Sequence, residues 1–264
     1  MTTSLRNHRT LFLSDLHLGA LGCRADLLLS FLQANRAETY VLVGDILDLW
    51  HPLLPHWTED AAHVLNHLKQ RRAEGARLIY LRGNHDPDPG RAPAEKRLDV
   101  APVDSLLHQA GDRRTYLVLH GDVADGRAVR SHAMTRLGSR IDHLLRRLDR
   151  GLSILRRTST AEARSTIEAL LSGVNALLYR RCGHERRLIA MARQAGADGV
   201  ICGHFHIARL HDAHGLIYAN CGDWVDSMTA LAEASDGSLQ LLGWRATETT
   251  VATVKGQPDL GPVR

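Results

Sequence analysis

The chain has 264 residues, of which 44% are hydrophobic and 23% are charged. This composition predicts one large globular domain with room for an inserted subdomain, and it excludes global disorder. The formal net charge of +4 favours anionic partners such as phosphates, nucleic acid or acidic lipid headgroups, without choosing among them. A solvated basic face with no partner is the commoner explanation of such a charge.

The four cysteines form no CxxC pair, so free thiols in a reducing cytoplasm are expected. The apolar stretch near the N-terminus is about four residues long before Asp15 interrupts it, which is too short for a secretory signal. No segment approaches the ~20 apolar residues of a membrane span. We therefore expect a cytoplasmic protein whose contact with the inner face of the membrane is peripheral.

Strands and helices are expected to alternate in the first half of the chain. The predicted elements are, in order, a strand at 10–14, a helix at 24–35, a strand at 39–43, a helix at 59–73, a strand at 77–82, an irregular loop at 88–100 and a strand at 116–119. In the second helix, Ala61, Val64 and Leu65 recur at helical spacing. Short loops between alternating elements predict parallel strands joined by crossover helices.

The pattern changes between residues 123 and 183. This segment has many arginines, no lysine and no strand signal, and apolar residues such as Leu144, Leu145 and Leu148 recur at helical spacing. Linkers lack such apolar faces. We therefore predict that 123–183 is a helical, arginine-rich insertion that forms a lid.

Core-type elements return after the insertion. They are a helix at 184–195 and strands at 199–202, 216–220, 228–234 and 239–245, with a turn at 236–237. Residues 1–122 and 184–246 would together form the core, and 247–264 a loose C-terminal tail. The sequence thus predicts an α/β fold that carries a helical insertion.

Five polar clusters follow predicted strands. They are SDLHLG (Asp15, His17), GDILD (Asp45, Asp48), GNHD (Asn84, His85, Asp86), HGD (His120) and GHFH (His204, His206). Ligands bind beyond the carboxyl ends of strands in open α/β sheets, so these side chains are expected to converge on one rim. Each cluster alone has an ordinary explanation, such as a turn or a helix cap. Their joint occurrence, in order, favours a functional site.

The residue types indicate metal chemistry. Hydrolysis of a phosphoester requires charge to be stabilised on the attacking oxygen, the leaving oxygen and phosphorus, and two nearby cations can do this. Mixed Asp, Asn and His ligands suit Mn²⁺, Fe²⁺ or Zn²⁺ better than Ca²⁺. Because the set has no thiolate, it does not indicate a structural zinc site.

This ordered set resembles the calcineurin-like metallophosphoesterase superfamily, whose pattern is DxH, GDxxD, GNHD, a later His and GHxH. The resemblance covers Asp15 to His206. It implies a four-layer α/β-β-α sandwich with metals at the sheet edge. It also implies two divalent ions, with Mn²⁺ preferred and Fe²⁺ or Zn²⁺ as alternatives.

The resemblance assigns a role to each residue of the pattern. The implied metal ligands are Asp15, His17 and His206 for the first ion, Asn84, His120 and His204 for the second, and Asp45 for both. His85 would contact the phosphoryl group or protonate the leaving oxygen, and Asp86 would steer it. Asp48 would orient a ligand or cap the next helix.

Further features resemble the UDP-2,3-diacylglucosamine diphosphatases of lipid A biosynthesis. They are Trp50 after GDILD, the stretch IYANCGDWVDSMTAL at 217–231 and the insertion. This resemblance implies cleavage of the pyrophosphate of a lipid-bearing sugar nucleotide, which releases lipid X and UMP. Leucine faces of the insertion could form an apolar groove, and Arg82, Arg127 and Arg130 are candidates for phosphate binding. The insertion's arginines could also meet an anionic membrane surface.

Three alternatives stay open. The same chemistry could act on another phosphodiester, a nucleotide or a phosphomonoester. A nuclease could track a phosphate backbone with its arginines, but an aromatic content of 5% provides few surfaces for base stacking. A non-enzymatic binding module would normally have lost ligands, and none is missing from the pattern.

Overall fold

The computed structural model describes residues 5–48, 56–86, 93–124, 183–244 and 249–253. Almost all of the predicted insertion, together with Trp50, Arg127 and Arg130, lies outside these ranges. The predictions made for them therefore stay predictions. None of the helices within these ranges is long and apolar enough to cross a membrane.

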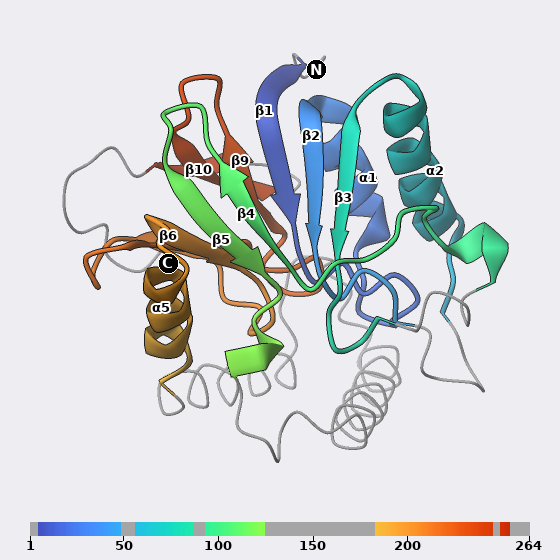
Figure 1. Cartoon of the computed structure of the whole chain (residues 1–264). Coiled ribbons are helices and arrows are strands. Elements are labelled where there is room, and N and C mark those ends of the chain that lie inside the picture. The colour runs from blue at the N-terminus through green and yellow to red at the C-terminus, as the bar shows by residue number, and fades with distance from the viewer. Residues whose placement is uncertain (1–4, 49–55, 87–92, 125–182, 245–248, 254–264) are drawn as a thin grey trace, which may run out of the picture.

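One sheet has six strands in the order β11-β10-β9-β1-β2-β3 (Figure 1). Their bounds are β1 Arg6–Leu13, β2 Asn35–Val43, β3 Arg77–Leu81, β9 Thr229–Glu233, β10 Leu239–Trp244 and β11 Thr249–Thr253. Strands β1, β2 and β3 are parallel, as the alternation of elements predicted, whereas β9, β10 and β11 join them as an antiparallel extension.

The second sheet has five strands in the order β4-β5-β6-β8-β7. Their bounds are β4 Ser105–Gln109, β5 Thr115–Leu119, β6 Gly199–Cys202, β7 Arg209–His211 and β8 Ile217–Asn220. The three central strands are parallel, and the two edge strands run antiparallel to their neighbours. The carboxyl ends of β5, β6 and β8 therefore share one edge of this sheet.

Helices cover the outer face of each sheet (Figure 1). Helices α1 (Ala25–Ala34) and α2 (Glu59–Ala73) pack on the first sheet, where Phe31 and Val64 join its buried cluster. Helix α5 (His184–Gln194) packs on the second sheet, where Leu188 is fully buried. Short 3₁₀ turns, η1 (Ala94–Lys96) and η2 (Asp122–Ala124), lie in connecting segments.

Side chains of the central strands point alternately toward the other sheet and toward the helices, and those that point toward the other sheet form the core between the sheets. Phe12 and Val41 point inward to meet Val118 and Ile201 of the other sheet. Neighbours of these residues point to the helices instead, so both faces of the central strands are buried. The result is four layers, α-β-β-α, which confirms the predicted fold class.

The predicted elements match the observed ones best in the core. The helix at 59–73 and the strand at 199–202 have the predicted bounds, and Thr58 caps the helix by accepting a hydrogen bond from the amide of Ala61. The turn at 236–237 closes the β9–β10 hairpin, where the amide of Gly237 donates to Ala234.

Three strands were not predicted, and all of them lie at sheet edges. β4 alternates between exposed and half-buried residues and keeps an exposed Leu107, so it lacks a clear polar face. β7 has only three residues. The prediction of a loose tail at 247–264 is wrong for β11, because residues 249–253 pair with β10.

Candidate metal centre

Loops after β1 and β6 bring together a first group of side chains. The group consists of Asp15, His17 and His206, each of which offers a ligand atom within 4.8 Å of the others. Nε2 of His206 lies 3.3 Å from Oδ1 of Asp15 and 3.2 Å from Nε2 of His17. Two imidazoles and a buried carboxylate thus face one point.

Loops after β2, β3 and β5 form a second group with the loop after β6. Nε2 of His120 lies 3.2 Å from Oδ2 of Asp45 and 3.2 Å from Oδ1 of Asn84. The ring of His204 lies 5.1 Å from that of His120. Asp45, His120 and His204 offer ligand atoms within 4.8 Å of one another. These are the partners expected for a second ion.

Asp45 lies between the two groups. Its Oδ2 is 3.2 Å from Nε2 of His120 and 4.0 Å from Nε2 of His17. Its Oδ1 accepts a hydrogen bond from the amide of His85 at 2.7 Å, which holds the carboxylate in place. One oxygen therefore faces both groups, as a carboxylate shared by two ions would.

The same residues match a known family. Residues 8–208 match the profile of the calcineurin-like phosphoesterases. The chain belongs to this family. Its members are in general metal-dependent phosphoester hydrolases, and the two His/Asp groups are consistent with a divalent metal site.

Relatives of this phosphoesterase include UDP-2,3-diacylglucosamine hydrolases of Neisseria meningitidis serogroups C and B. Each is 26% identical over 241 residues, covering 86% of this chain and 95% of the relative. Similar solved structures include wild-type Vps29 of Entamoeba histolytica complexed with Zn²⁺ (13% identity, TM-score 0.46, 93% of this chain and 97% of that one). Another is the phosphoesterase YfcE of E. coli (15% identity, TM-score 0.38, 88% and 87%).

Three imidazoles of the site have an acceptor facing Nδ1, the ring nitrogen on the side away from the cluster. Nδ1 of His120 lies 2.9 Å from the carbonyl oxygen of Val43. Nδ1 of His17 lies 3.4 Å from Asp48, and Nδ1 of His206 lies 3.2 Å from Asp223. Each ring therefore turns its Nε2 toward the cluster. Asp223 was not predicted, although it follows β8 in the same way that the predicted residues follow their strands.

The site residues adopt an unusual backbone. Positive φ angles occur at Asp15 (52°), His17 (46°), Asp45 (54°), His204 (77°) and His206 (59°). Such conformations cost a non-glycine residue of order 1–3 kcal/mol each and cluster at functional sites. A side chain at Gly203 would collide with Oγ of Ser14 and Oδ2 of Asp15, so only glycine fits there.

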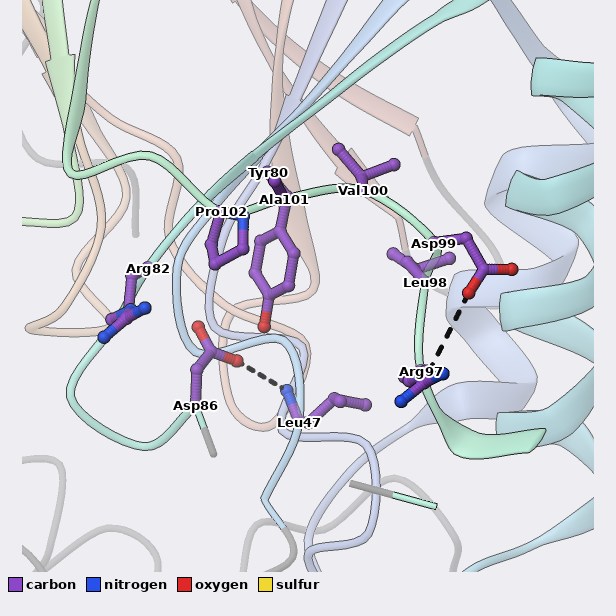
Figure 2. Close-up of a pocket in the computed structure, with 10 residues that line it drawn as sticks. All are labelled: Leu47, Tyr80, Arg82, Asp86, Arg97, Leu98, Asp99, Val100, Ala101 and Pro102. Carbon is purple, nitrogen blue, oxygen red and sulfur yellow. Dashed lines mark hydrogen bonds and ion pairs between the residues drawn. The ribbon is translucent and has the colours of Figure 1, made fainter. Parts of the chain in front are cut away.

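The predicted pairing of His85 with Asp86 is wrong. Figure 2 shows the carboxylate of Asp86 turned toward the amide of Leu47. It accepts backbone hydrogen bonds from four residues: Gly83 (2.8 Å), Asp45 (2.9 Å), Ile46 (2.9 Å) and Leu47 (3.0 Å). Asp86 therefore braces the loop that carries Asp45.

Asp48 occupies the place that was predicted for Asp86. Its Oδ2 lies 3.2 Å from Nδ1 of His85 and 3.4 Å from Nδ1 of His17. Of its two predicted roles, contact with an expected ligand agrees with this position. Capping of the next helix does not, because Thr58 caps α2.

The acids of the site are held as anions. Burial opposes ionisation of Asp45, but the neighbouring charge of His120 lowers the pKa of Asp45 well below its usual value. Burial likewise opposes ionisation of Asp15, and the charge of His206 lowers its pKa. In the described part of the chain, Oδ1 of Asp15 is buried and receives no hydrogen bond. A buried anionic oxygen of this kind suits a cation.

The imidazoles supply the compensating charge. Burial would lower the pKa of His17, but the carboxylates of Asp15 and Asp48, which face its two ring nitrogens, raise it to about 10. A similar balance, with burial opposed by nearby carboxylates, raises the pKa of His120 and His206. Protons on these rings and metal ions would occupy the same anionic cluster, so they would compete.

Arg82, the candidate phosphate ligand within the described ranges, lies beside the site. It lines a cavity of about 240 Å³ together with Tyr80, Asp86 and Arg97 (Figure 2). The rest of the wall is largely apolar and includes Leu98.

Cys221 is fully buried in the core between the sheets.

Proposed function

We propose that the phosphoesterase hydrolyses the pyrophosphate bond of UDP-2,3-diacylglucosamine, releasing lipid X and UMP. The observation that carries the hydrolase assignment is the position of Asp45 between two His/Asp groups. The substrate assignment is supported by the Neisseria hydrolases, which resemble this chain over nearly their whole length.

The proposed ligands fit a pair of divalent ions. They are Asp15, His17 and His206 for one ion, Asn84, His120 and His204 for the other, and Asp45 for both. All donors are oxygen or imidazole nitrogen, the set favoured by Mn²⁺, Fe²⁺ and Zn²⁺. When bound, such ions would stabilise charge on the attacking and leaving oxygens and acidify a water molecule.

We assign His85 to the reacting phosphoryl group. Asp48 holds Nδ1 of His85 at 3.2 Å, so Nε2 is the nitrogen proposed to contact the phosphoryl oxygen or protonate the leaving oxygen. A general acid or base of this kind contributes about 10²–10⁴-fold to the rate. Asp86 supports this chemistry only through the loop that carries Asp45.

The phosphates and the acyl chains of the substrate would lie against basic and apolar surfaces, respectively. Arg82 is proposed to bind a phosphate from the edge of the cavity beside Asp86, and Arg127 and Arg130 are proposed to assist from the insertion. The insertion is also proposed to supply the groove for the acyl chains and to contact an anionic membrane surface peripherally, at the inner face of the cytoplasmic membrane.

A second candidate substrate class is another phosphodiester, a nucleotide or a phosphomonoester. His85 favours this class, because the best-known lipid A diphosphatases have arginine at this position, whereas histidine is the general residue of the superfamily. The proposed metal centre would be the same for both classes.

A substrate screen separates these functions. Purified protein with Mn²⁺ is incubated with UDP-2,3-diacylglucosamine and, separately, with bis-p-nitrophenyl phosphate, and metal content is measured on the same batch. Release of UMP, lost in Asp45→Asn, is the expected result. Turnover of the chromogenic diester without UMP release would reject the lipid substrate but keep the hydrolase. A chain that binds no metal and turns over neither substrate would reject the hydrolase itself.

A further inference from the structure

Asp223 is a buried carboxylate at the carboxyl end of β8 with no exposed surface. Its Oδ2 accepts hydrogen bonds from the amides of Val225 (3.2 Å) and Asp226 (2.8 Å), and its Oδ1 accepts one from the amide of Ser227 (2.8 Å). These three donors fix the carboxylate in one orientation. A buried anion held this firmly can in turn orient a neighbour.

The neighbour is His206. Oδ2 of Asp223 lies 3.2 Å from Nδ1 of His206, while Nε2 of the same ring lies 3.3 Å from Oδ1 of Asp15. The imidazole therefore spans two carboxylates, one on the metal side and one behind it. Since Nδ1 faces an acceptor, the tautomer with a proton on Nδ1 leaves the Nε2 lone pair for a cation.

The imidazoles of the first group differ in this respect from His120 of the second. Both imidazoles of the first group are backed by carboxylates, Asp48 behind His17 and Asp223 behind His206. In the second group, His120 is backed by the neutral carbonyl oxygen of Val43. A carboxylate behind a ligating histidine makes the ring a stronger base and fixes its direction.

We propose that Asp223 is a positioning residue that holds the Nδ1 proton of His206 and so sets the affinity of the first metal position. This inference rests on the proposed function, because it presupposes that His206 binds a metal ion. Loss of such a partner lowers metal affinity about 10–100-fold. Asp223 acts through His206 and does not itself touch the ion.

The test is a metal titration on three variants of the full chain. Asp223→Asn leaves one carbonyl oxygen, so the amide nitrogen must face either the loop amides or the ring. Ser227→Ala is the matched control, because it disturbs the same loop but keeps the carboxylate facing His206. Asp212→Asn removes a negative charge from an exposed position. We expect Asp223→Asn to raise the dissociation constant of one Mn²⁺ about 10–100-fold, with the second Mn²⁺ and both controls unchanged.

Equal weakening in Asp223→Asn and Ser227→Ala would overturn the inference, because the loop alone would then explain it. Asp223→Asn that binds two Mn²⁺ as tightly as wild type would also overturn it, while leaving the hydrolase proposal intact. A wild-type chain that binds no Mn²⁺ would overturn both.

A second measurement needs no variant. In the Zn²⁺-loaded wild-type protein, long-range ¹H–¹⁵N correlation spectra should show His206 with metal on Nε2 and a proton on Nδ1. Metal on Nδ1 of His206 would overturn the inference even if Asp223→Asn failed to fold.

Discussion

The role of Asp86 gives the sharpest test of the site, because sequence and structure assign it differently. Asp86→Ala removes the acceptor of four buried backbone amides. Each buried N–H left unpaired costs about 1–3 kcal/mol. If water from the adjoining cavity satisfies two of them, the other two cost about 2–6 kcal/mol.

One effect works in the opposite direction. Burial, followed by the charge of Asp45, raises the pKa of Asp86, so removal of the carboxylate relieves some unfavourable charge. We therefore expect the free energy of unfolding to fall by at least about 2 kcal/mol, the lower end of that range. Such a loss lowers the melting temperature by at least about 4 °C. Asp86→Asn should lie between wild type and Asp86→Ala, since one oxygen can still serve two of the four amides.

Differential scanning calorimetry and metal analysis check this prediction. Metal content should fall together with stability, because three of the four freed amides belong to the loop of Asp45. Asp99→Ala is the control, since Asp99 lines the same cavity but is exposed. If Asp86→Ala kept its melting temperature and metal but lost kcat, Asp86 would steer catalysis as the sequence predicted, and the bracing role would be wrong.

The other predictions concern neighbouring parts of the structure. Asp45→Ala should nearly abolish turnover and lower metal stoichiometry, since one carboxylate faces both groups; unchanged stoichiometry by elemental analysis would contradict a shared ligand. His85→Ala should lower kcat about 10²–10⁴-fold with metal retained, and loss of metal in this variant would mean that His85 is a ligand. Gly203→Ala should prevent metal binding because its methyl group would collide with Ser14 and Asp15; a variant that binds two ions normally would refute the argument. Burial opposes ionisation of Glu233, but the hydrogen bond from His108 lowers its pKa below the usual 4.5. Its stabilising effect is therefore present above pH 4.5 and is lost as the pH falls through the lower folded-state value, so Glu233→Gln should flatten the acid side of the melting-temperature curve.

The core and the metal loops could be predicted because both depend on local pattern. The apolar runs of the central strands are visible in sequence, and each expected side chain follows one of them directly. Parallel strands end at one edge, so convergence follows from topology alone. The edge strands β4, β7 and β11 gave no such signal. β4 has no fully buried residue, β7 has three residues, and β11 pairs with β10 alone.

The partners of the site residues could not be predicted in the same way. Asp86 follows His85 in sequence, but residues 84–86 form a bend in which backbone amides take up the carboxylate of Asp86. The carboxylate that reaches His85 therefore comes from another loop, at Asp48. Asp223 could have been found by its place after β8, but it lies beyond the DxH-to-GHxH pattern, which ends at His206.

The aspartates around this site thus take two roles, and the groups that surround each carboxylate decide which role it takes. Oδ1 of Asp15 and Oδ2 of Asp45 face imidazole nitrogens and receive no backbone amide in the described part of the chain. Both oxygens of Asp86 and of Asp223 accept backbone amides instead. An anion surrounded by amide donors fixes a loop, whereas an anion with an open oxygen can take a cation. Asp86 holds the amide of Asp45, and Asp223 faces Nδ1 of His206. Each fixing anion therefore acts on a site residue whose positive φ costs free energy.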